Sequence, residues 1–225
     1  MRLSLALLLL LTPVATSANL ERLIDTQTIE AIANEVSGVS ARRNLDTITL
    51  YHRTRASSQY RQAAEFVLTR LQAYGFDSAR IRSYPADGTT LFGTQKSRPA
   101  WDVEFAELWE LDADGRRLRR HGSWDAMPLS VAQDSVSGKA TAELVDIGKG
   151  TEEADYTGKD IRGKLVLTVS QPGAVQDLAV TRHGAAGIIS YAPNQKSAWW
   201  LEDDRLVRWG HLDSFKEPGS FAFMV

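Results

Sequence analysis

Two aliphatic runs separated by a short helical stretch constrain the fold of this chain more than any other feature. The runs span 165–169 and 185–191, and both have the length of a buried strand. Between them, residues 174–183 place Val175, Leu178 and Ala179 on one side of a short helix. The sequence therefore predicts a strand–helix–strand core.

The N-terminal part has the apolar spacing of helices. Residues 20–36 fit one amphipathic helix or two short ones, ended by Gly38, and residues 41–51 fit a further helical stretch. The clearest helix spans 58–74, and its apolar face is made by Tyr60, Ala63, Ala64, Val67, Leu71 and Tyr74.

Both ends of the 58–74 helix carry capping signals. Ser57 or Ser58 can cap its start, because a hydroxyl accepts a hydrogen bond from a free backbone N–H. Gly75 can close its end in the left-handed conformation. These signals predict the helix boundaries.

Strand patterns dominate the rest of the chain. Residues 76–84 alternate and predict one strand, followed by a turn at 85–88, and Asp114-Gly115 is a hairpin signal. The other expected strands are 103–111, a return strand through Leu118, 142–147 and 221–225. Helices first and strands later predict an α+β fold. Because 221–225 is a buried-strand pattern with no polar tail after it, we expect the chain to be truncated there; a genuine C-terminal strand is the alternative.

The first residues have the layout of a secretory signal peptide. Arg2 precedes an apolar run over 3–11, Pro13 breaks the run, and small residues follow at 15–18. The run is shorter than the roughly 20 residues that a bilayer-spanning helix needs. We therefore expect residues 1–18 to be removed and the mature chain to be secreted or periplasmic, with no later membrane span.

Composition excludes several classes of function. The chain has no cysteine, so disulfides, thiol catalysis and thiolate metal sites are excluded, and the core must be large enough to stand alone. The net charge is −2, whereas nucleic-acid-binding proteins usually carry a basic footprint. The one basic run, residues 116–121, is predicted to be a solvated strand face rather than a binding patch.

Residues 158–164 have the spacing of a phosphate-binding loop, with Gly158, Gly163 and Lys164. The next residue is Leu165 instead of Ser or Thr, and the glycines precede a strand instead of opening a helix. The segment is therefore predicted to be a turn that leads into a strand. No G-x-S-x-G elbow of a serine hydrolase is present.

His211-Leu212-Asp213 has the spacing of a zinc-ligand pair, because alternate residues of a strand point to the same side. A two-metal centre needs several more carboxylate and histidine ligands and a carboxylate base. After Asp213 the only acid is Glu217, no histidine follows, and residues 203–209 are too charged for a buried strand. The pair is therefore not predicted to bind zinc, although a small metal enzyme built on it is an alternative hypothesis.

Tryptophans flank the acidic residues 202–204. Trp199, Trp200 and Trp209 could line a peptide-binding groove together with these carboxylates. The interpretation that we favour is that they fasten a long loop to the domain core.

Residues 144–191 resemble a protease-associated (PA) domain. The matching residues are Val145-Asp146-Ile147-Gly148, Asp155-Tyr156, residues 160–167, Ala179, residues 184–189 and Tyr191. The resemblance implies a β-rich domain of the swivelling β/β/α type around the strand–helix–strand core. In this arrangement Gly184 and Gly187 allow tight packing before the second strand.

The lead-in resembles the start of aminopeptidase-Y-like zinc peptidases, metallopeptidase family twenty-eight. The resemblance is carried by residues 52–55, the 58–74 helix, Gly75-Phe76 and the stretch to Tyr84-Pro85, whereas 209–213 and 221–225 resemble the last part of the inserted PA domain. It implies three parts: a signal peptide at 1–18, a helical lead-in with the first strand at 19–88, and the PA domain with flanking β segments at 89–225.

This resemblance implies a function for the complete protein. That protein would be a di-zinc exopeptidase, its PA domain a lid or substrate-selecting wall, and its partners a peptide or protein substrate and the catalytic domain of the same protein. The family's ligands would lie beyond Val225, so we assign no catalytic, cofactor-binding or metal-ligating residue here, and we expect the chain alone to be inactive and free of zinc. The alternative is a free-standing PA module that binds peptides or proteins.

Overall fold

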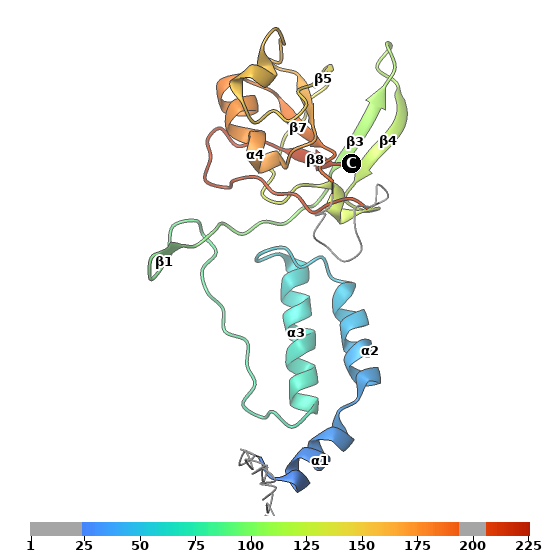
Figure 1. Ribbon diagram of the computed structural model, residues 1–225, viewed down its shortest axis with the longest axis vertical. Coiled ribbons are helices and arrows are strands. Elements are labelled where there is room, and N and C mark those ends of the chain that lie inside the picture. The colour runs from blue at the N-terminus through green and yellow to red at the C-terminus, as the bar shows by residue number, and fades with distance from the viewer. Residues whose placement is uncertain (1–23, 194–205) are drawn as a thin grey trace, which may run out of the picture. The chain divides into compact units, whose positions relative to one another are not determined.

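The computed structural model describes residues 24–193 and 206–225 (Figure 1). The predicted signal peptide lies outside the described residues. The chain divides into two compact units, residues 1–46 and 47–225. Helices and strands are both present, as predicted for an α+β protein. No described helix combines the length and the apolarity needed to cross a membrane.

The first unit contains α1 (Thr26–Glu35) and most of α2 (Gly38–Thr49). Asp25 caps α1, because its carboxylate accepts the Thr28 N–H at 2.8 Å. The prediction that Gly38 ends the first helix is wrong. α1 ends at Glu35, and Gly38 begins α2, where the Ser37 hydroxyl accepts the Ser40 N–H at 3.2 Å. At this position the capping serine, which marks a helix start, outweighs the glycine, which was interpreted as a helix end.

α3 (Ser58–Ala73) opens and closes as predicted. The Ser57 hydroxyl accepts the Tyr60 N–H at 3.1 Å. At the other end Gly75 has a φ of 89°, and the N–H groups of Gly75 and Phe76 bond to the carbonyls of Gln72 and Leu71. This pair of bonds is a Schellman motif.

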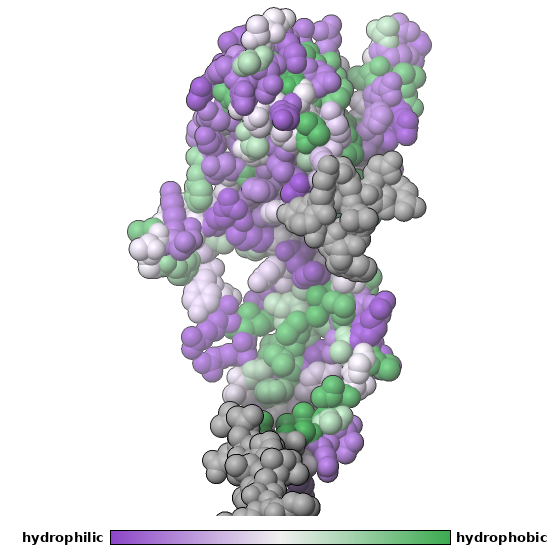
Figure 2. Space-filling model, viewed as in Figure 1, coloured by the Kyte–Doolittle hydropathy of each residue, from purple (hydrophilic) through white to green (hydrophobic). Residues whose placement is uncertain are grey.

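The apolar face of α3 is largely open. Ala63 is its buried residue, whereas Tyr60 is 52% exposed and Val67 39% exposed. Figure 2 shows apolar surface in this helical region. The predicted apolar face is therefore present on α3, but among the described residues no other segment buries most of its side chains.

The strand predicted over 76–84 is wrong. No strand is present between α3 and residue 91 among the described residues, and Phe76 and Tyr84 are 59% and 64% exposed. An extended segment becomes a strand only when it pairs with a neighbour. The alternating pattern identified an extended stretch and could not supply the pairing partner.

Two antiparallel hairpins follow. The short one pairs β1 (Leu91–Phe92) with β2 (Gln95–Lys96), and the longer one pairs β3 (Glu107–Leu111) with β4 (Arg117–Ser123) across the predicted Asp114-Gly115 turn. The longer strand pair was expected to begin at residue 103 but starts at Glu107, and Phe105 before it is 68% exposed.

The basic run on β4 is a solvated strand face, as predicted. Its residues 117–121 are exposed, and the guanidinium groups of Arg117 and Arg120 lie 4.8 Å and 5.8 Å from the centre of the Trp109 ring. Both arginines also pair with Glu107, at 3.5 Å and 3.2 Å. The positive charges of Arg117 and Arg120 are thus compensated by Glu107 on the neighbouring strand.

The core is a four-stranded parallel sheet in the order β5–β6–β7–β8. Its strands are β5 (Leu144–Asp146), β6 (Leu165–Thr168), β7 (Gly187–Ser190) and β8 (Ala222–Met224). The predicted crossover helix starts at Pro172 as α4 (Pro172–Gln176) and continues as a π-helical segment over Asp177–Arg182. Proline fits the first turn because its missing N–H would have no partner there.

The crossover helix packs on the sheet through the predicted residues. Val175 and Ala179 are fully buried, and Leu178 packs beside them. The buried core of this part comprises Ala132, Ile147, Tyr156, Ile161, Val166, Val175, Ala179, Val180, Ala185, Ile188, Leu212 and Ala222. This core carries the strand–helix–strand unit that the sequence predicts.

Gly187 is a close-packing position in β7. A Cβ added there would lie 2.5 Å from Cε2 of the Phe221 ring, which also packs on Gly138. We expect Gly187→Ala to lower the free energy of unfolding by about 2 kcal/mol, because the ring or the strand must move. Urea denaturation checks this. Gly38→Ala is the control, since nothing lies within 4 Å of its added Cβ, and equal midpoints for the two variants would contradict the expectation.

The ionisation of Tyr156 can be used to measure burial in this core. Its hydroxyl donates to the Gly150 carbonyl at 2.7 Å, and its ring stacks on His183 at 4.5 Å. Burial, with the charges of Asp155 and Glu153 adding, raises the pKa of Tyr156 from 10.0 to about 12.

Because the folded pKa is the higher one, ionisation favours unfolding. The stabilisation is complete below pH 10 and is lost as the pH rises toward about 12. Absorbance at 295 nm should therefore show one of the six tyrosines ionising late, and Tyr156→Phe should remove that phase. Uniform titration of all six would contradict the burial argument.

Candidate functional site

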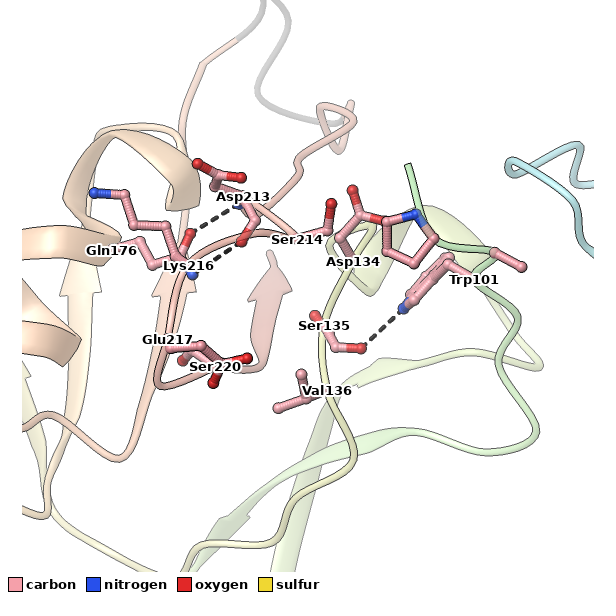
Figure 3. Close-up of a pocket in the computed structure, with 13 residues that line it drawn as sticks. Trp101, Asp134, Ser135, Val136, Gln176, Asp213, Ser214, Lys216, Glu217 and Ser220 are labelled. Atoms are coloured by element: carbon pink, nitrogen blue, oxygen red, sulfur yellow. Dashed lines mark hydrogen bonds between the residues drawn. The ribbon is translucent and has the colours of Figure 1, made fainter. Parts of the chain in front are cut away.

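A pocket of about 270 Å³ lies between three chain segments beside the parallel sheet (Figure 3). One segment follows the β1–β2 hairpin, one follows the 3-10 turn Pro128–Ser130, and one precedes β8. The lining residues are Pro99, Ala100, Trp101, Asp134, Ser135, Val136, Gln176, Asp213, Ser214, Lys216, Glu217, Gly219 and Ser220.

The middle segment, residues 131–136, is fixed on two sides. Val131 forms an antiparallel bridge to Phe223 of β8, and Gln133 forms a parallel bridge to His211. Main-chain hydrogen bonds of 2.9 Å join Ala132 to Ala222 and Gln133 to Gly210. The segment therefore continues the sheet beyond β8. Its bridge at Gln133 holds the following residue, Asp134, at the pocket.

Asp134 is a buried acid in a strained backbone conformation. Its φ is 68°, in the left-handed region that Asp tolerates better than most residues, and its side chain is 1% exposed. The carboxylate pairs with Arg55 at 2.5 Å through Oδ1, and Arg98 lies 3.9 Å from Oδ2. The buried charge is therefore compensated by guanidinium groups from two segments.

Arg55 also joins the start of α3 to the pocket wall. Its Nε donates to the Pro99 carbonyl at 3.0 Å, and its own carbonyl accepts the Trp101 N–H at 3.2 Å. The Ser58 N–H donates to the Asp102 carboxylate at 2.8 Å, and this hydrogen bond lowers the pKa of Asp102. The helix start and the 99–102 segment are thus held together.

Gln176 holds the third segment. This buried residue of α4 accepts the Asp213 N–H at 2.8 Å and donates to the Asp213 carbonyl at 3.4 Å (Figure 3). Lys216 of the same segment bonds to Asp177 at 2.9 Å, and that contact holds the pKa of the Asp177 carboxyl below its usual value, with Arg182 adding. The crossover helix thereby sets the position of residues 213–216.

Two polar atoms at the pocket have no hydrogen-bond partner among the described residues. They are Oδ2 of Asp134 and Oγ of Ser214, and both atoms are buried. Buried polar groups in native proteins are nearly always paired, so each such atom requires an explanation. One carboxylate oxygen and one hydroxyl can together accept one hydrogen bond and donate another.

Among the described residues, no third side chain joins His211 and Asp213 in a group that could hold a metal ion. Leu212 is fully buried in the core, His211 stacks on Trp209 at 5.0 Å, and the Asp213 carboxylate accepts the Phe215 N–H at 3.0 Å. Over residues 24–193 and 206–225, no group of three or more His, Asp or Glu side chains is placed to hold a metal ion.

The phosphate-loop-like segment is a turn, as predicted. Gly158 and Gly163 have φ values of 73° and 71°, and the turn leads into β6. Lys164 pairs with Glu143 at 2.9 Å and lies 3.6 Å from Asp160, so its ammonium is engaged by protein carboxylates.

A second, more open pocket is lined by Trp209 and residues around His52. Burial, with the Arg53 charge adding, lowers the pKa of His52, whose ring meets Trp124 edge-on at 4.9 Å. Trp209 is 49% exposed. Trp199, Trp200 and the acidic residues 202–204 lie outside the described residues, so the choice between groove and loop fastener stays a prediction.

Sequence reasoning missed the residues that build the first pocket. Asp134 and Gln176 are polar residues at buried positions, and hydrophobic periodicity gives no signal for such positions. Arg55 was noted only for its place in the lead-in. The polar pair Gln133-Asp134 between apolar Val131 and Val136 was the one available hint.

Comparison with solved structures gives a distant likeness. No family model matches the chain, and no curated protein matches it. Among solved structures, an aminopeptidase from Aneurinibacillus sp. strain AM-1 is 16% identical with a TM-score of 0.34, and the alignment covers 80% of this chain and 36% of that chain. This chain thus spans about a third of that aminopeptidase. At this level of similarity the likeness supports no conclusion about activity.

Proposed function

We propose that this chain is the non-catalytic front part of a secreted zinc-dependent exopeptidase, in which residues 89–225 form a PA domain that acts as a lid or substrate-selecting wall. The observation that carries the proposal is that residues 144–191, which resemble a PA domain, fold together as one unit. Residues 144–191 form β5, β6, the crossover helix and β7, and the motif glycines Gly148, Gly163 and Gly184 take the left-handed turns of that unit.

The open apolar face of α3 supports a partner domain. Tyr60, Val67, Leu71 and Tyr74 are 38–52% exposed along one helix, and exposed apolar patches often mark interaction surfaces. In this proposal the catalytic domain of the same protein covers that face. The two zinc ions belong to that domain, which the 225 residues do not include.

The test uses the full chain produced in a host that exports proteins. We expect the secreted product to begin at Asn19 by intact mass, to contain less than stoichiometric zinc, and to leave aminoacyl anilides and peptides unhydrolysed. Bound zinc at one or two equivalents together with turnover would overturn the proposal.

A free-standing peptide- or protein-binding PA module is the second candidate. It is favoured by the first pocket, whose lining lies wholly within the described residues of one unit and includes the unpaired Asp134 and Ser214 atoms. Reading the encoding DNA beyond Val225 separates the two. A frame that encodes His-x-Asp, Glu-Glu and a further histidine supports the peptidase, and a stop codon supports the module.

A further inference from the structure

We propose that the pocket between residues 99–101, 134–136 and 213–220 binds one backbone amide of an uncharged peptide segment. In this assignment Asp134 Oδ2 accepts the peptide N–H and the Ser214 hydroxyl donates to the peptide carbonyl. The identity of the ligand as a peptide rests on the proposed function, and the donor and acceptor rest on the pocket itself.

The unpaired atoms carry the argument. The Asp134 side chain is 1% exposed, yet only Oδ1 has a hydrogen-bond partner. The Ser214 hydroxyl is also buried without a partner among the described residues. Figure 3 draws both side chains in the same part of the pocket, although they come from segments far apart in the sequence. A ligand that fills one acceptor and one donor satisfies both.

A peptide amide is the complementary group. A carboxylate oxygen only accepts, whereas a hydroxyl can donate, and an amide offers one N–H and one C=O. An unpaired buried carboxylate oxygen also strengthens the expected bond, because hydrogen bonds to charged acceptors are about twice as strong as neutral ones.

The charges around Asp134 favour a neutral ligand over a cation. Arg55 lies 2.5 Å from Oδ1 and Arg98 lies 3.9 Å from Oδ2. A ligand ammonium at Oδ2 would therefore face two guanidinium groups that already compensate the single carboxylate charge. An amide N–H meets the same oxygen without that repulsion.

One part of the wall suits a small apolar side chain. Pro99, Trp101 and Val136 line the pocket. The Trp101 indole is held in place, because its N–H donates to the Ser135 carbonyl at 2.8 Å and its ring meets Trp124 edge-on at 6.1 Å. A fixed aromatic wall loses little conformational freedom when a ligand binds.

Isothermal titration of the full chain with a capped, uncharged tripeptide of alanine and leucine tests the assignment. We expect Asp134→Asn and Ser214→Ala each to weaken binding about tenfold, which corresponds to the loss of one such hydrogen bond. In Asp134→Asn the amide oxygen must still accept from Arg55, so the NH₂ group takes the place of Oδ2 and cannot accept. Glu110→Gln, at an exposed position of β3 that does not line the pocket, should change affinity less than twofold.

Several results would overturn the assignment. They are absence of peptide binding to the natural chain, equal affinity of the natural chain and Ser214→Ala, equal binding of the N-methylated tripeptide, and a salt-sensitive preference for a free amine that Glu217→Gln weakens. Circular dichroism of each variant reports folding, and Ser214→Ala keeps the test decisive if Asp134→Asn does not fold. Zinc content and turnover are separate measurements, so failure here and failure of the proposed function are distinguishable.

Discussion

Replacing Leu212 by alanine should lower the free energy of unfolding by about 3 kcal/mol, whereas His211→Ala and Asp213→Ala should each cost about 1 kcal/mol or less. Leu212 is fully buried against the sheet core, so its removal leaves a cavity. His211 loses a stack on Trp209, and Asp213 loses one hydrogen bond to the Phe215 N–H. Urea denaturation of the three variants measures the order.

This order distinguishes a structural motif from a metal site. If His211 and Asp213 ligated zinc, their replacement would lower stability in zinc-containing buffer but not after chelation, because metal binding stabilises only the folded state. We expect chelation to leave all three values unchanged. A cost for His211→Ala that exceeds that of Leu212→Ala, and that depends on zinc, would revive the metal hypothesis.

The periodic elements of the fold could be predicted from the sequence. The 58–74 helix and the strands around residues 165–169 and 185–191 carry strong local signals: Ser57 and Gly75 at the helix ends, and aliphatic runs in the strands. The structure places them as predicted. The helix boundary near Gly38 and the 76–84 strand failed because each depends on a competing cap or on a pairing partner that local patterns do not contain.

The pocket could not be predicted, because its parts are far apart in the sequence. Arg55 and Asp134 are separated by 79 residues, and Gln176 and Asp213 by 37. In each pair the two residues become neighbours only when the chain has folded. Sequence reasoning instead weighed 158–164 and 211–213, whose residues are close in sequence and which the structure uses as a turn and as a core segment.

The second large effect concerns the ion pair between Arg55 and the pocket residue Asp134. Arg55→Ala should lower the free energy of unfolding by about 3 kcal/mol, because it leaves the Asp134 carboxylate buried with its main partner gone. Arg98, 41% exposed and 3.9 Å away, can supply part of the lost compensation, which keeps the cost at the low end of the range for buried pairs. Thermal and urea denaturation measure it.

A double-mutant cycle makes this expectation specific to the pair. The combined variant Arg55→Ala with Asp134→Ala should cost less than the sum of the two single variants, because no unpaired buried charge remains. Arg61→Ala is the matched control: Arg61 pairs with Glu65 on the surface of α3, where both side chains are more than half exposed, so it should cost below about 1 kcal/mol. Equal costs for Arg55→Ala and Arg61→Ala, or strict additivity in the cycle, would mean that Asp134 is not held as a buried charge. The residue that we assign to peptide binding would then lack the fixed position that the assignment requires.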